Sequence, residues 1–340
     1  MGKPSFHVVD GDVGPIPAAR AFAALDRTPF PGLNGHPLFG DFTRRLYRTI
    51  HPSGYPDRSF VVAGEIGPAV AVACTVGTNE VSSLGLPAVV ALRRDLDVSV
   101  AAKALTVAFE HLDRIGANDG ASLARVRGGE AGHFGPLDHI CIARLAKPVA
   151  KMHAVVDLAG GEEAIRRGLR DSYRSLVNWG RKQMVMTYIN GDNPDRAQFD
   201  AFPSLHSRIA GSGARGPDYW NVVWEEIARG DAELSLGRLA DGSLVAGTLS
   251  VFTGGSAYYA SGVYDRERFE KPIAHWPMFD ALVRAAARGI SRYDLGEVLP
   301  RGTASEKEVQ IGFFKKGFTD RIVLWIEWHV SLTPPQSAST

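Results

Sequence analysis

The segment FFKKGF, residues 313–318, places two lysines among three aromatic rings and a glycine, shortly after an acidic strand end. A lysine ammonium that faces a reacting carbonyl can stabilise the oxyanion of a tetrahedral intermediate. Lys315 could do this, because the surrounding phenylalanines would lower the local dielectric. The alternative is purely structural: cations are favoured at a helix C-terminus, and Gly317 suits a C-cap.

Acidic and phenolic side chains accompany these lysines. Asp294 and Glu297 stand at the C-terminal end of an expected strand, where α/β sheets commonly bind ligands. Either carboxylate could accept a proton from an attacking amine, although an ion pair with Arg301 would explain Glu297 equally well. Tyr258 and Tyr259 point to opposite faces of one strand, and we expect Tyr259 to line the site.

A basic stretch precedes them in the chain. Arg166, Arg170 and Arg174 have i, i+4, i+8 spacing in a segment with helical periodicity, so they should lie along one helix face. We group Lys316 with them as a candidate contact for tRNA. The stretch stands out because the chain's charges nearly balance, with 38 basic against 37 acidic residues. It would suit RNA or nucleotide phosphates, and a solvated helix face is the common alternative.

Length and composition bound the possible classes. A chain of 340 residues with 45% hydrophobic and 22% charged residues suits two ordinary globular domains. Cys74 and Cys141 lie in apolar stretches and suggest buried hydrophobes rather than a disulfide framework. His133 and His139 lack a suitably spaced third ligand, so we expect no metal and no cofactor. Without a signal-peptide pattern or a long apolar run, we expect a cytoplasmic protein with no membrane span.

Strand and helix signals alternate through the second half of the chain. The dipeptides Asp241-Gly242 and Gly254-Gly255 are hairpin signals between three strands. The expected strands cover 153–158, 185–189, 233–240, 243–253, 256–264, 291–296 and 321–332. The expected helices cover 162–183, 192–210, 217–229, 272–289 and 305–316.

The first half repeats this pattern more faintly. Its expected elements are a strand FHVVD, helices over 16–27 and 37–49, a hairpin of SFVVAGEI with PAVAVACTVG, a helix over 97–115, and strands SLARVR and HICIARL. Repetition at about half the length suggests two copies of one α/β unit. We therefore expect domains at 1–148 and 149–332, followed by a disordered tail at 333–340.

Several stretches, in their order and spacing, resemble the Fem family of aminoacyl-tRNA-dependent peptidoglycan-bridge aminoacyltransferases, most clearly over 153–319. They are MHAVVDLAGGEEAIRRGLRDSYRSLVNWGRKQ, ARGPDYW, DGSLVAGTLSVFTGGSAYYASG, and HWPMFDALVRAAARGISRYDLGEV followed by IGFFKKGF. The resemblance implies an α/β fold of two tandem GNAT-like domains, each a mixed, mostly antiparallel sheet flanked by helices. It also implies transfer of an amino acid from aminoacyl-tRNA to an amine, in a peptidoglycan precursor or a natural-product intermediate.

The same resemblance implies roles for individual residues. Phe314 and Lys315 match the family's Phe-Lys pair at the reacting centre. Arg215 and Tyr219 match a pair that holds the acceptor's phosphates, which suits the bidentate fork of arginine; capping of the next helix is the alternative for Arg215. Where family members have a lysine early in the first half, this chain offers Arg44 or Arg45.

The donor is inferred partly from an absence. Acyl-CoA enzymes of the GNAT fold carry an Arg/Gln-x-x-Gly-x-Gly/Ala turn whose backbone N–H groups hold pyrophosphate. Here the corresponding segment reads DRERFEKPIAHW and contains no glycine. This disfavours acyl-CoA, which stays as the alternative donor for an N-acyltransferase. A non-catalytic protein that binds a nucleotide-sugar or tRNA is the second alternative.

Overall fold

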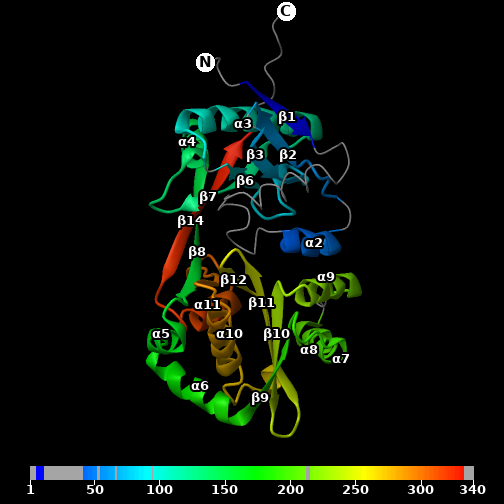
Figure 1. Ribbon diagram of the computed structural model, residues 1–340, viewed down its shortest axis with the longest axis vertical. Coiled ribbons are helices and arrows are strands. Elements are labelled where there is room, and N and C mark those ends of the chain that lie inside the picture. The colour runs from blue at the N-terminus through cyan, green and yellow to red at the C-terminus, as the bar shows by residue number, and fades with distance from the viewer. Residues whose placement is uncertain are drawn as a thin grey trace, which may run out of the picture. The chain divides into compact units, whose positions relative to one another are not determined.

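The computed structural model describes residues 5–10, 41–51, 54–65, 67–93, 95–211 and 215–332 (Figure 1). They form two compact units. The first unit includes the described residues of 5–10, 51–151 and 324–332, and the second includes those of 41–50 and 152–323. The chain therefore enters the second unit twice and returns to the first for its last strand. The helix expected at 16–27 and the tail at 333–340 lie outside the described residues.

The first unit contains two sets of paired strands. An antiparallel sheet has the order β1 (Phe6–Asp10), β2 (Phe60–Gly64), β3 (Gly67–Ala73) and β6 (Val89–Leu92). The other set has the order β4 (Thr75–Val76), β5 (Glu80–Ser82), β7 (Leu123–Glu130) and β14 (Ile322–Ser331). In this set only β5 and β7 run parallel to each other.

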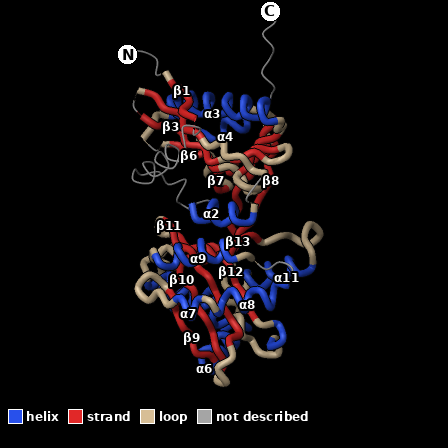
Figure 2. Tube along the Cα trace, turned by 90° about the vertical axis from the view of Figure 1, so that its right-hand side faces the viewer, coloured by secondary structure: helices blue, strands red, loops and turns tan. Residues whose placement is uncertain are grey.

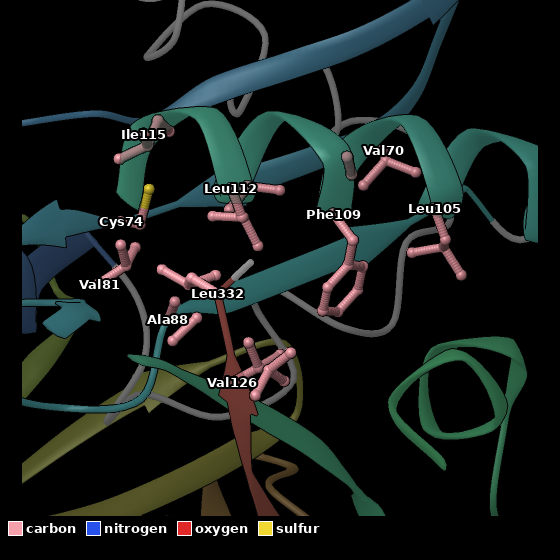
Figure 3. Close-up of a cluster of buried hydrophobic side chains, with 14 of the residues drawn as sticks. Val70, Cys74, Val81, Ala88, Leu105, Phe109, Leu112, Ile115, Val126 and Leu332 are labelled. Carbon is pink, nitrogen blue, oxygen red and sulfur yellow. The ribbon is translucent and has the colours of Figure 1, made fainter. Parts of the chain in front are cut away.

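Helix α3 (Val98–Asp119) closes the core of the first unit (Figure 3). Its buried residues Leu105, Phe109 and Leu112 recur at helical spacing and pack against strand residues such as Val70 and Val126. Cys74 lies in this core as a buried free thiol, as predicted.

One strand predicted in this unit is wrong. HICIARL lies mostly in a helix, α4 (Pro136–Ala143), with Pro136 in its first turn. The Asp138 carboxylate accepts a hydrogen bond from the N–H of Gly135, which caps the helix, and another from the N–H of Gly129 on β7. Cys141 then faces the core. A short apolar run does not by itself distinguish a strand from a buried helix.

The sheet of the second unit is mixed and mostly antiparallel, as predicted. Its order is β8 (Lys147–Asp157), β13 (Arg292–Glu297), β12 (Ser256–Tyr264), β11 (Leu244–Thr253), β10 (Ala232–Leu239) and β9 (Met184–Ile189). Only β12 and β13 pair in parallel. The hairpin turns occur where predicted, because Gly242, Gly254 and Gly255 all have positive φ.

Helices cover both faces of this sheet (Figures 1 and 2). One face packs against α5 (Gly161–Gly168), α6 (Asp171–Gln183) and α10 (His275–Ala287), around a core that includes Tyr293 and Phe279. The other packs against α8 (Ala201–Ala210), α9 (Pro217–Ala228) and α2 (Asp41–Ile50), with α7 (Arg196–Phe199) beside them. In α11 (Glu306–Lys315) Ser305 and Glu308 form a capping box. None of the described helices is long and apolar enough to cross a bilayer.

The single helix predicted over 162–183 is two helices. Leu169 and Arg170 between α5 and α6 are extended, with ψ of 141° and 139°. Leu169 is buried in the core by this break, and Gly168 before it is a weak helix former. Arg166, Arg170 and Arg174 therefore fall in α5, at the N-cap of α6 and inside α6. They do not share one helix face.

Candidate active site

The parallel strands β12 and β13 separate in the middle of the second unit's sheet. They pair only through Ser256 to Tyr258 with Arg292 to Asp294. Beyond this point β12 continues to Tyr264 and β13 to Glu297 without pairing to each other. We call residues 258–262 of β12 with residues 294–297 of β13 the β12–β13 fork. Polar side chains from several elements gather at this fork.

Lys315, the last residue of α11, reaches the fork. Its Nζ donates to the backbone carbonyl of Glu297 at 3.0 Å. Gly296 has a φ of +87°, and a Cβ built there would lie 3.0 Å from Lys315 Nζ and 3.4 Å from Tyr258 Oη. The glycine thus lets an ammonium and a phenol approach the same point of backbone. Burial lowers the pKa of Lys315, while the charges of Asp294 and Glu297 oppose that shift.

The neighbouring lysine has a different environment. Lys316 is exposed and lies at the C-cap of α11 in right-handed helical conformation. Gly317 does not have a positive φ, so it does not form the left-handed C-cap that its sequence position suggested. It instead allows close contact, because a Cβ there would stand 2.0 Å from the Tyr173 ring.

Asp294 is bound on both sides within the protein. Its Oδ2 lies 2.7 Å from Nδ1 of His153 on β8, and its Oδ1 accepts the Gly296 N–H at 2.6 Å. Asp294 and His153 are both buried. Because both carboxylate oxygens already have partners, Asp294 is better suited to hold the 294–297 turn than to accept a proton from an amine.

The structure places Tyr258, rather than the expected Tyr259, beside Lys315. The hydroxyl of Tyr259 lies 3.2 Å from that of Tyr264, and its ring packs against the core that contains α10. Tyr258 is the register partner of Asp294. Burial and the charge of Asp294 raise the pKa of Tyr258, so its hydroxyl is a hydrogen-bond donor at neutral pH.

A second polar group comes from α2 and the start of α9. The Arg215 guanidinium lies 5.5 Å from the Tyr219 ring centroid, and the Trp220 indole donates to the Arg215 carbonyl. Burial raises the pKa of Tyr47 and Tyr219, and the Arg215 charge opposes this in both. Tyr47 and Tyr219 in turn raise the pKa of Tyr258. This group therefore lies within electrostatic range of the fork.

Arg45 has other partners. Its guanidinium donates to Glu225 at 2.9 Å and to Glu226 at 2.6 Å, which fastens α2 to α9. The electrostatic contribution of α2 to Tyr258 comes from Tyr47, which no motif in the sequence had indicated. His153 and Gly296 were also missed, and Tyr258 was considered but not chosen, because their importance depends on strand register.

The predicted tRNA-contacting arginines have separate contacts. Arg166 donates to Asn178 and lies 3.5 Å from Glu162. Arg174 lies 3.5 Å from Asp171. Arg170 instead binds the end of α11, where its side chain donates to the Phe313 carbonyl and its backbone N–H donates to the Gly317 carbonyl.

Phe314 lies in the aromatic cluster that joins α6, α10 and α11. Its ring contacts Tyr173, His275 and Phe318 at centroid distances of 6.2, 5.5 and 5.1 Å. This cluster supports the last turn of α11 and hence the position of Lys315. Among the described residues, no group of three or more His, Cys, Asp or Glu could hold a metal ion.

Known proteins share this architecture. A family model described as an acetyltransferase (GNAT) domain matches residues 163–308. A crystal structure of FemX is similar with 15% identity and a TM-score of 0.68, over 93% of this chain and 96% of that chain. L-PGS from Bacillus licheniformis is similar with 12% identity and a TM-score of 0.57, over 94% and 93% of the two chains.

A tandem GNAT protein from the clavulanic acid biosynthesis pathway is similar with 11% identity and a TM-score of 0.51, over 98% and 100% of the two chains. No curated protein matches the chain in sequence. Identities this low establish the fold alone. The predicted tandem GNAT-like fold is therefore confirmed, and the family model over 163–308 supports an acyltransferase.

Proposed function

We propose that this protein is an aminoacyltransferase that joins an amino acid from aminoacyl-tRNA to an amine acceptor. The observation that carries the proposal is the approach of the Lys315 ammonium and the Tyr258 hydroxyl to Gly296 at the β12–β13 fork. Two donors converge where strands have parted, and this arrangement suits a carbonyl whose oxygen gains negative charge.

In the proposed reaction one bond forms, one bond breaks and one proton is transferred. The acceptor nitrogen attacks the ester carbonyl carbon, so a C–N bond forms and the bond to the ribose oxygen then breaks. The nitrogen loses a proton and the ribose oxygen gains one. Lys315 can stabilise the oxyanion or the departing ribose oxygen, and its lowered pKa makes it a better proton donor to that oxygen.

The segment between β12 and α10 supports tRNA over acyl-CoA as the donor. It contains no glycine, and Pro272 supplies no N–H. The Asp265 carboxylate accepts the N–H of Glu267, so part of the local backbone is already satisfied. A pyrophosphate cradle needs several free N–H groups, which this segment is poorly built to provide. The overall likeness to FemX points the same way.

The group of Arg215, Tyr219 and Tyr47 supports a phosphate-bearing acceptor. A guanidinium can bind phosphate bidentately, and adjacent phenols can donate further hydrogen bonds. The acceptor would then be an amine linked to a nucleotide, or another small molecule with a phosphate, such as a peptidoglycan precursor or a natural-product intermediate.

Transfer of a labelled amino acid tests the proposal. Purified protein is given charged tRNA and a candidate amine acceptor, with and without RNase, and acetyl-CoA binding is measured by calorimetry. We expect transfer that RNase abolishes, and no acetyl-CoA binding at a Kd of about 10 μM. Binding of acetyl-CoA, with transfer of its acetyl group to the acceptor and no transfer from charged tRNA, would establish the acyl-CoA alternative. Binding of tRNA without transfer to any acceptor class would favour the non-catalytic alternative.

A further inference from the structure

An exposed aromatic ring lies two residues before Lys315. Phe313 is 58% exposed, whereas Phe318 in the same segment is 1% exposed. The guanidinium of Arg170 lies 3.9 Å from the centre of the Phe313 ring, and it also donates to the Phe313 carbonyl at 3.2 Å. We call these two side chains the Phe313–Arg170 platform. The planar guanidinium is stacked over one face of the ring, so the platform is a cationic plane layered on an apolar one.

Two hydrogen bonds to backbone carbonyls hold the segments that carry the platform. The Arg170 N–H donates to the Gly317 carbonyl at 2.9 Å, and the Tyr173 hydroxyl donates to the Phe314 carbonyl at 3.3 Å. The start of α6 is thus joined to the end of α11 at two points. A ligand that stacks here would pay little to order the protein side of the contact.

The charge around the platform is positive. Lys316 is exposed, and Arg174 keeps 48% of its side-chain surface exposed. The segment 161–183 contains six basic residues against three acidic ones: Arg166, Arg167, Arg170, Arg174, Arg181 and Lys182 against Glu162, Glu163 and Asp171. Aromatic rings interleaved with cations are the pattern by which proteins bind unpaired nucleotides.

We propose that the Phe313–Arg170 platform stacks an unpaired base at the 3′ end of the tRNA donor, while Arg174 and Lys316 contact nearby phosphates. The inference rests on the proposed function, because it takes aminoacyl-tRNA as the donor. Phe313 precedes Lys315 by two residues, which is about 3 Å along the axis of α11 but about 200° around it. The 3′ end would therefore pass around the end of the helix between the platform and the fork. The adenine of a CoA thioester has the same stacking chemistry.

The test measures binding of a short single-stranded RNA ending in CCA, by fluorescence anisotropy at two salt concentrations. Phe313→Leu keeps an apolar side chain without the aromatic face, and Phe313→Trp keeps the face. We expect Phe313→Leu to weaken binding about 10-fold with an unchanged salt slope, and Phe313→Trp to bind like the unaltered protein. The matched control is Phe134→Leu, since Phe134 is 47% exposed in the other unit and should leave binding unchanged.

Equal RNA affinity for Phe313→Leu and the unaltered protein would overturn the inference. Arg170 would then only shield the Phe313 ring from solvent. CoA binding that Phe313→Leu weakens, with RNA binding unaffected, would overturn it in favour of the other adenine source. Because the assay needs no turnover, its result is separable from the proposed function. RNA stacking on the platform without amino acid transfer would support the inference and contradict the aminoacyltransferase.

Discussion

Lys315 and Lys316 are adjacent in sequence but differ in surroundings. The first donates to the Glu297 carbonyl at the fork and the second is exposed. We expect Lys315→Met to lower kcat by roughly 10²-fold or more with a smaller change in KM, because a transition-state donor is lost. Lys316→Met should leave kcat nearly unchanged, and the loss of its proposed phosphate contact should raise KM instead. Steady-state kinetics with charged tRNA would measure both. Equally small effects at the two positions would remove Lys315 from the chemistry.

At this scale the sequence pointed to Lys315, Asp294 and Glu297 but not to Tyr258 or His153. A motif of neighbouring letters, FFKKGF, was enough to select Lys315. Tyr258 could not be chosen over Tyr259 in the same way, because the choice depends on the parallel register with Asp294 and on an irregularity opposite Leu249 and Ser250 in the next strand. His153 is likewise significant only through its contact with a distant strand.

At the scale of elements, turn signals predicted well, whereas a cap signal and an apolar run did not. Gly242 marks a turn that the structure contains, and Gly317 does not form the left-handed C-cap that was considered. HICIARL failed because hydrophobicity without periodicity fits two elements. The break at Leu169 was missed because each flanking piece has helical periodicity, while burial of one leucine depends on the core it enters.

The junction of α6 with α11 yields a prediction at this scale. Gly317→Ala should destabilise the protein by about 1–3 kcal/mol, because its Cβ would meet the Tyr173 ring at 2.0 Å. Gly168→Ala is the matched control, since nothing lies within 4 Å of its Cβ position. It should change stability by less than about 1 kcal/mol. Urea denaturation monitored by tryptophan fluorescence measures both. Equal stabilities would show that the ring moves aside freely.

At the scale of the whole molecule, internal repetition predicted a tandem fold, but not the path of the chain between the two units. Phe42 and Leu46 give α2 an apolar face, yet nothing local shows that this face packs in the core of the second unit. Which core a helix joins depends on every apolar surface of the chain that could pack against it. For the same reason, the return of β14 to the first unit could not be read from its own residues.

The stability of the whole molecule should depend on a few buried titrating groups, because its formal net charge at pH 7 is only +1. Burial raises the pKa of Asp280 from an ordinary 3.8 to about 6. The folded state then keeps its proton where the unfolded state loses it, so stability falls as pH rises from about 4 to about 6. Burial lowers the pKa of His206 and His275, and their contribution is lost as pH falls below their ordinary value.

These opposing contributions make Asp280→Asn informative. The Tyr188 hydroxyl can still donate to the side-chain oxygen, and the charge is gone. We expect the variant to gain stability relative to the unaltered protein between pH 4 and pH 7, by about 2–3 kcal/mol at most. The lowered pKa values of the two histidines and of buried carboxylates such as Glu233 would then act in one direction, so the variant's stability should rise more steeply with pH over this window. Asp171→Asn, at a carboxylate with 94% of its side-chain surface exposed, is the control and should shift nothing. Parallel pH profiles for Asp280→Asn and the unaltered protein would mean that Asp280 is already ionised throughout this window.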